Sequence, residues 1–196
     1  MDNAFATILR EGPNAPSEDS IELMWAHWLL VKDWNTRVNL TSIKKDSEAA
    51  WLHYQDSLSA QSFIDGGPIV DMGSGGGFPG VPLAIIFPEL QVTLVEPRRK
   101  RASFQRVVAA RLGLKNVTVL NGRSTDTPPT EFAALVTRAT FSNLSDIQAC
   151  LRWLSRDGSL VAYRSADSDV LPGVTTSHFY SLAEHDRRLD ILNQSE

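Results

Sequence analysis

The apolar positions of the first 65 residues have the spacing of helices. Over residues 20–35 they recur close to the 3.6-residue helical period, at Ile21, Met24, Trp25, Trp28, Leu29 and Val31. A second helix is predicted from Asp46 to about Phe63, before the turn-forming Asp-Gly-Gly-Pro of residues 65–68. The tryptophans of this region are interpreted as core rather than as a ligand platform. We therefore predict an N-terminal helical extension over residues 1–65.

After Pro68 the pattern changes to strands that alternate with helices. Short apolar runs predict strands at residues 69–72, 91–95, 117–120, 132–137 and 160–163, with helices at 81–87, 98–112 and 142–154. This alternation is typical of a parallel sheet with helices on both faces. Residues 178–183 and 189–192 predict a terminal antiparallel hairpin. The predicted fold class is α/β, a doubly wound Rossmann-like core over residues 66–196 that forms one compact domain with the extension.

Composition excludes several classes of protein. With 196 residues, 42% of them hydrophobic, the chain can bury one real core. Its longest apolar stretches are about seven residues, whereas a membrane span needs roughly 20. The N-terminus lacks the pattern of a secretory signal. A single cysteine, Cys150, allows neither an internal disulfide nor a cysteine-based zinc site. We expect a cytoplasmic protein with no membrane contact and no metal.

The distribution of charge is more informative than its sum of −4. Residues 97–125 hold eight basic side chains and no acidic one, while the other 167 residues hold 11 basic and 23 acidic side chains. One face of the protein should therefore be strongly positive on an acidic body. Nucleic acid is the partner that this predicts, and a merely solvated helix face is the alternative.

The glycine cluster after the first predicted strand is the sharpest motif. Gly73, Gly75 and Gly77 alternate directly after residues 69–72 and before a predicted helix. Glycines there permit positive φ and expose backbone to a ligand, and the helix N-terminus adds unpaired N–H groups. Glu96 follows the next predicted strand, where a carboxylate can accept hydrogen bonds from both hydroxyls of a ribose.

Two cofactor classes fit this pattern. Gly75, Gly77 and Gly80 match the dinucleotide motif G-x-G-x-x-G, but counted from Gly73 its third glycine falls on Phe78. A strand, an aspartate two residues before the first glycine and a G-x-G-x-G run favour S-adenosylmethionine. A glycine turn that binds nothing is the remaining alternative.

From about Trp34 to Arg164 the chain resembles the bacterial small-subunit ribosomal RNA guanine-N7 methyltransferases, the RsmG or GidB family. The most specific marks are the extension of the glycine run to Gly-Phe-Pro-Gly-x-Pro-Leu and the segment Asn-Leu-Thr-Ser-Ile at residues 39–43. Further marks are Trp34-Asn35, His53 with Asp56-Ser57, Lys100-Arg101, residues 112–117 and Thr137-Arg138-Ala139.

The resemblance implies that Gly73, Phe78, the pair Ser124-Thr125 and Arg138 line the S-adenosylmethionine pocket. From their charge, Lys100, Arg101 and Arg123 are expected to bind RNA phosphates, and Arg164 is a further predicted RNA-binding residue. The sequence also departs from the family, with Glu96 for the usual Asp, Thr140 between Ala139 and Phe141, Arg164-Ser165 for Lys-Gly, and Ser124-Thr125 for a more acidic pair.

Methylation of guanine N7 needs no general base, because N7 carries a lone pair and no proton. We assign Arg138 a positioning role in contacts that leave N7 free; a surface arginine or an ion pair with Glu96 is the alternative. His53 is the one candidate base, and the alternative is a structural histidine, with Asp56 either fixing its tautomer or capping a loop. Phe78 and Phe141 are candidates to stack the base, against core packing for each.

The sequence thus predicts a monomeric enzyme that transfers a methyl group from S-adenosylmethionine to a guanine N7 of 16S ribosomal RNA, free or in the small ribosomal subunit. One alternative is a methyltransferase of the same fold that acts on a small molecule or a protein. The other is a non-catalytic RNA-binding or ribosome-assembly module.

Overall fold

A mixed sheet forms the centre of the computed structural model, which describes residues 3–128, 130–138 and 144–194. Within these residues the sheet has seven strands in the order β3-β2-β1-β4-β5-β7-β6. The first five pair in parallel, and β7 runs antiparallel to both β5 and β6. The strands are β1 (Ile69–Met72), β2 (Val92–Val95), β3 (Val117–Leu120), β4 (Phe132–Arg138), β5 (Leu154–Ser165), β6 (Thr176–Leu182) and β7 (His185–Asn193). The predicted parallel core and terminal hairpin are confirmed.

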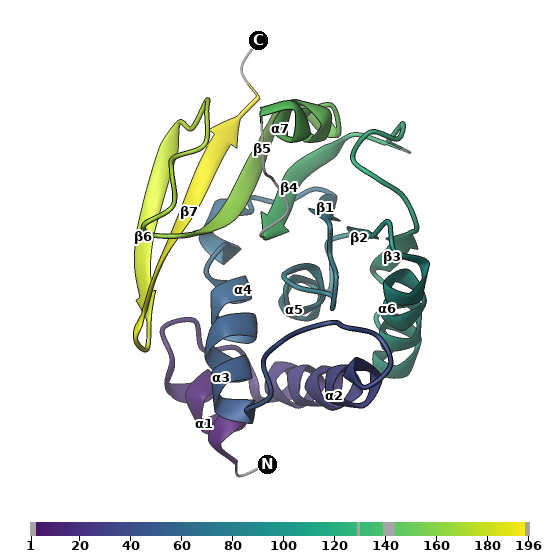
Figure 1. Ribbon diagram of the computed structural model, residues 1–196, viewed down its shortest axis with the longest axis vertical. Helices are drawn as coiled ribbons and strands as arrows, with labels where there is room; N and C mark the ends of the chain where they lie inside the picture. The colour runs from purple at the N-terminus through teal and green to yellow at the C-terminus, as the bar shows by residue number, and fades with distance from the viewer. Residues whose placement is uncertain (1–2, 129, 139–143, 195–196) are drawn as a thin grey trace.

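The helices pack on both faces of this sheet. They are α1 (Ala4–Glu11), α2 (Glu18–Asn35), α3 (Asp46–Ala49), α4 (Asp56–Leu58), α5 (Gly80–Ile86), α6 (Arg99–Leu112) and α7 (Leu144–Leu151). In Figure 1, α1, α2 and α5 lie on the opposite side of the sheet from α7, and α6 stands beside β3 at one end. The doubly wound arrangement is therefore confirmed.

The sheet separates two hydrophobic cores. The larger core joins the N-terminal helices to α5, α6 and one face of the strands, and Trp28 is fully buried in it. Trp25 and Trp34 pack against the same core, as expected of core tryptophans. The smaller core lies under α7, around Ile147, Cys150 and Trp153. The helical extension thus shares its core with the sheet, while a domain boundary at residue 65 stays a prediction.

The predicted helix over residues 46–63 is wrong as a single element. It is divided into α3, a π-helical segment η1 (Ala50–Gln55), α4 and a 3₁₀ turn η2 (Gln61–Phe63). Two polar side chains of η1, His53 and Gln55, are buried and bond to other segments, which apolar periodicity does not encode. Such π-helical turns occur frequently at functional sites.

Three other elements, β5, β7 and α7, also differ clearly from their predicted lengths, and β7 extends to residues 185–193. Strand β5 is longer than predicted because β7 pairs along it as far as Ser165. Helix α7 is shorter than the predicted 142–154, and residues 142 and 143 lie outside the described part of the chain. In the described ranges no helix combines the length and the hydropathy needed to cross a membrane.

Candidate active site

The glycine loop leaves β1 at the carboxyl edge of the sheet. Gly73, Gly75 and Gly77 have φ values of +76°, +53° and +90°, in the left-handed region that favours glycine. The loop is tied to β2, since the Gly73 N–H donates to the Val95 carbonyl at 2.8 Å. At Gly80 a Cβ atom would lie 2.3 Å from Leu94 Cδ2. The motif therefore permits both the turn and the close seat of α5 on the sheet.

Two side chains from other helices hold this loop, and neither was predicted from the sequence. His27 of α2 is fully buried, and its Nε2 donates to the Gly76 carbonyl at 3.0 Å while Tyr54 Oη donates to Nδ1 at 3.0 Å. Burial lowers the pKa of His27 to about 3, so the ring is neutral and this tautomer is fixed. Gln105 of α6 donates to the Gly75 carbonyl at 2.9 Å.

Glu96 lies beside the loop, where the sequence predicts it. Its carboxylate is 3% exposed and accepts the Gly75 N–H at 2.9 Å and the Arg98 N–H at 2.8 Å. Asp71, at the other end of the motif, accepts the Gly80 N–H at 2.7 Å. Burial raises the pKa of Asp71 to about 7, although the Gly80 N–H opposes the shift. The two acids thus hold the middle of the loop at Gly75 and its end at Gly80.

A cavity of about 420 Å³ opens against the loop, and we call it the cofactor cavity. A Cβ at Gly76 would lie 3.4 Å from the Phe78 ring and 3.6 Å from Leu40, both of which line the cavity, so a side chain there would narrow it. Together with a carboxylate able to accept ribose hydroxyls, this open backbone fits a nucleoside cofactor. The lining residues are Leu40, His53, Gly73, Ser74, Gly75, Gly76, Phe78, Glu96, Pro97, Arg98, Arg101 and Arg138.

Three predicted cofactor contacts do not line this cavity. Gly77 belongs to the loop but packs against α5, since a Cβ at Gly77 would lie 2.7 Å from Val81 Cγ2. Ser124 and Thr125 lie after β3, and their carbonyls accept hydrogen bonds from Trp153 and Arg152. The structure brings together the other five predicted residues, Gly73, Gly75, Phe78, Glu96 and Arg138.

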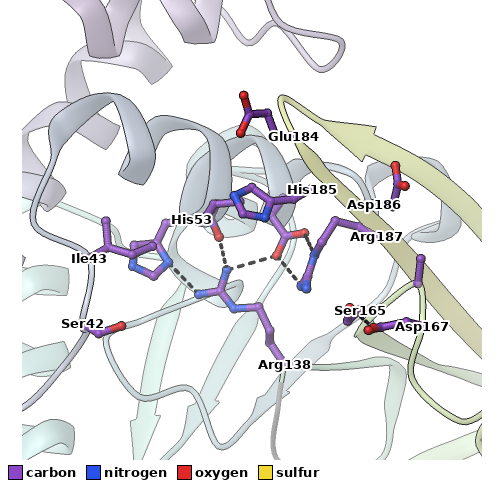
Figure 2. Close-up of a pocket in the computed structure, with 13 residues that line it drawn as sticks. Ser42, Ile43, His53, Arg138, Ser165, Asp167, Glu184, His185, Asp186 and Arg187 are labelled. Carbon is purple, nitrogen blue, oxygen red and sulfur yellow. Dashed lines mark hydrogen bonds and ion pairs between the residues drawn. The ribbon is translucent and has the colours of Figure 1, made fainter.

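Arg138, at the end of β4, is held by the segment that precedes and forms α4 (Figure 2). Nη1 donates to the Leu52 carbonyl at 2.8 Å and to Asp56 Oδ2 at 3.2 Å, and Nη2 donates to His53 Nδ1 at 3.0 Å. Its side chain is 15% exposed. The alternative of an ion pair with Glu96 is wrong: the described partner is Asp56, which lies 82 residues away in sequence.

Asp56 is the centre of a cluster that joins the helical extension to the sheet. Its carboxylate is 1% exposed and accepts Tyr180 Oη at 2.8 Å, Arg187 Nε at 3.0 Å and Arg187 Nη2 at 3.2 Å besides Arg138. The expectation that Asp56 fixes the tautomer of His53 is wrong, because the carboxylate binds the two arginines instead. Sequence periodicity gave no signal for Arg187.

His53 is a poor base in this arrangement. Since a guanidinium can only donate, Nδ1 must accept from Arg138, which leaves Nε2 to donate to Thr41 Oγ1 at 2.8 Å. Burial and the Arg138 charge hold the pKa of His53 well below its usual value of 6.5.

The His53 ring stacks on Phe78, with centroids 4.3 Å apart and planes at 12°. Phe78 is 5% exposed and packs in the core, which is the alternative to base stacking. Phe141, Ala139 and Thr140 lie outside the described residues.

A second cavity of about 750 Å³ adjoins the first, and we call it the acceptor cavity. His53 and Arg138 line both cavities, so these two side chains form the wall between them. The remaining lining residues are Ser42, Ile43, Leu52, Asp56, Ser165, Ala166, Asp167, Glu184, His185, Asp186 and Arg187, several of which Figure 2 shows around the cluster.

The predicted RNA-binding side chains occupy different places. Lys100 is exposed at the start of α6, and Arg101 reaches the cofactor cavity and donates to the Asn39 carbonyl. Arg123 is exposed after β3. Arg164 lies on β5 and donates to the Asp169 carbonyl at 3.3 Å, and it lines neither cavity.

Solved structures share this arrangement. A crystal structure titled as a SAM-dependent methyltransferase from Aquifex aeolicus matches 74% of this chain and 93% of its own, at 15% identity and a TM-score of 0.59. The cofactor-bound Rv0187 from MTB matches all of both chains at 18% identity and a TM-score of 0.63. Fold, sheet order and glycine loop define the class as a Rossmann-like α/β protein with the fold that these methyltransferases share.

Sequence comparison identifies the family. The family model described as GidB, rRNA small subunit methyltransferase G, matches residues 20–176. The ribosomal RNA small subunit methyltransferase G of Chromobacterium violaceum is 37% identical over 150 residues, which are 76% of this chain and 72% of the relative. That of Neisseria gonorrhoeae is 35% identical over 168 residues, 85% and 79% of the two chains. This chain belongs to the GidB family of small-subunit ribosomal RNA methyltransferases.

Proposed function

We propose that this protein transfers a methyl group from S-adenosylmethionine to N7 of a guanine in 16S ribosomal RNA, in the cytoplasm and as a monomer. One observation supports N7 as the acceptor atom. The cofactor cavity and the acceptor cavity share a wall of His53 and Arg138, and the Nδ1 lone pair of His53 already accepts a hydrogen bond. An acceptor atom that has no proton to lose suits such a wall.

The cofactor cavity supplies the contacts that S-adenosylmethionine requires. Glu96 already accepts two backbone N–H groups, and a carboxylate has lone pairs left for ribose hydroxyls. Gly73 and Gly75 present open backbone on the same side. When bound, the cofactor supplies an activated methyl group. The protein therefore contributes mainly position, which can provide most of the acceleration of a displacement that needs no proton transfer.

Arg138 is the proposed positioning residue for the acceptor. Asp56 and the Leu52 carbonyl hold its guanidinium in the wall between the cavities. A contact from Arg138 to O6 or to a phosphate would orient a guanine and leave N7 free, whereas donation to N7 would occupy the attacking lone pair. The acceptor cavity is the proposed place for the base.

The basic segment favours RNA over a small molecule or a protein as substrate. Arg98, Arg99 and Lys100 are exposed next to the cofactor cavity. A non-catalytic module would not need the buried Glu96 or the braced glycine loop. We retain Lys100, Arg101, Arg123 and Arg164 as proposed phosphate contacts, although Arg123 and Arg164 line neither cavity.

Two measurements test the proposal. Calorimetry with S-adenosylmethionine should give saturable binding, and its absence would leave only a non-catalytic module. Transfer of a tritiated methyl group should then be compared on naked 16S RNA and on unmodified small subunits. Label in RNA from either substrate supports the enzyme, and binding of the cofactor without any label in RNA would favour a small-molecule or protein substrate.

A further inference from the structure

A groove outside both cavities lies between the end of α2 and the start of α6. It consists of two depressions, of about 430 and 340 Å³, which share Arg37, Val38, Arg99 and Lys100. Trp34 completes one end, and Arg98 and Arg101 complete the other. We call this the α2–α6 groove.

The lining of this groove is cationic. Five of its side chains carry a positive charge, from two separate elements, and none of the lining residues is acidic. Asp33 pairs with Arg37 at 2.8 Å, but both side chains are more than 60% exposed and such a pair is weak. The Arg37 guanidinium lies 5.5 Å from the centre of the Trp34 ring, which steadies it along the groove.

The groove continues into the site. Arg98 and Arg101 line both the groove and the cofactor cavity, and Arg138 and His53 line both the cofactor cavity and the acceptor cavity. A strand that lies in the groove therefore leads along one continuous surface to the wall between the cavities. Its charge and its continuity distinguish the groove from the rest of α6, where Arg106 and Arg111 are exposed but line none of these depressions.

We propose that single-stranded RNA flanking the target guanine binds in the α2–α6 groove through its phosphates. Arg37 of the helical extension and Arg99 of α6 would then contact the RNA from two different segments of the chain. This inference rests on the proposed function. RNA methylated in a cavity must continue past its edge, and the cationic surface that adjoins the cofactor cavity is the place where phosphates gain most.

The test uses the full chain with Arg37→Ala and Arg99→Ala combined. Neither residue lines the cofactor cavity, so the dissociation constant for S-adenosylmethionine should not change. The matched control is Arg106→Ala with Arg111→Ala, which removes the same number of charges, both from α6 and outside the groove. Binding to in vitro transcribed 16S RNA and to unmodified small subunits is measured against salt, with thermal unfolding as a check on the fold.

The groove variant should bind RNA about 25-fold more weakly at 0.1 M monovalent salt. This estimate takes about 0.7 released counterion for each of two single-strand phosphate contacts, and the slope of log affinity against log salt should fall by about 1.4. The control should stay within about threefold of the wild type. Equal losses in both variants, or no loss in the groove variant, would overturn the proposal.

Two further outcomes are separable. If the groove variant binds naked RNA normally but binds subunits weakly, the groove contacts a ribosomal protein, and the RNA path is refuted. If wild-type protein transfers no methyl group to RNA, the proposed function fails, whatever the groove variant does. If the wild type methylates RNA and the groove variant binds and methylates RNA equally well, only the proposed role of the groove is refuted.

Discussion

Replacement of Asp56 by asparagine should weaken both the fold and methyl transfer. The substitution keeps the shape of the side chain and removes its charge, which leaves Arg138 and Arg187 without their shared carboxylate. Asp56 is 1% exposed and the two arginine side chains are 15% and 21% exposed, so all three charges are largely removed from water. Breaking a buried pair of this kind costs about 3–5 kcal/mol. We expect about 3 kcal/mol, because both arginines retain some contact with water.

Urea unfolding measures the loss of stability, and single-turnover methyl transfer at saturating cofactor and RNA measures the displacement of Arg138. The rate should fall at least tenfold, which corresponds to about 1.4 kcal/mol, while cofactor affinity changes little. The matched control is Glu18→Gln, which breaks the exposed pair with Arg10 and should cost far less stability than Asp56→Asn, because solvent screens that pair. Adding Arg187→Gln to Asp56→Asn should recover part of the stability, because one unpaired cation is removed. A loss no larger than that of Glu18→Gln, with an unchanged rate, would refute the role given to Asp56.

Three other predictions concern the cofactor, the mechanism and acid stability. Glu96→Ala should weaken S-adenosylmethionine binding at least tenfold in calorimetry, because charge-assisted bonds to ribose are lost; an unchanged dissociation constant in a folded variant would remove Glu96 from the site. Single-turnover transfer should be nearly constant from about pH 6 to 9, since the pKa of His53 lies well below 6.5; a steep rise with pH that disappears in His53→Ala would show a base. The pKa of His27 is about 3 in the folded protein and about 6.5 in the unfolded chain, so the unfolded state binds the proton as pH falls below 6.5, and this costs about 2 kcal/mol of stability at pH 5. His27→Asn removes this loss, so the change in unfolding free energy from pH 7 to pH 5 should differ by that amount between wild type and variant. Asp71 contributes in the opposite direction, but it does so in both proteins.

The parallel core could be predicted because its signals are local. Each strand from β1 to β5 contains a short apolar run, and the glycines that follow β1 need positive φ at the turn itself. The place of Glu96 beside the loop follows from β1 and β2 being parallel neighbours. These inferences need only the sequence of one strand, turn and helix at a time.

The supports of the site could not be predicted, because they connect segments that are far apart in sequence. His27 bonds to Gly76 across 49 positions, and Arg187 bonds to Asp56 across 131. A buried polar residue on a helix gives no periodic signal of its partner. The π-helical segment that carries His53 could not be predicted for the same reason, since its buried polar groups form hydrogen bonds with residues of other elements.

The most direct test of the central claim is the identity of the methylated atom. Unmodified small subunits and naked 16S RNA are incubated with the protein and labelled S-adenosylmethionine, and the RNA is then digested to nucleosides for chromatography and mass spectrometry. A base-free wall of Arg138 and neutral His53 predicts that the label is recovered as 7-methylguanosine. Label on an exocyclic amine or a ribose hydroxyl, each of which must lose a proton, would contradict the account.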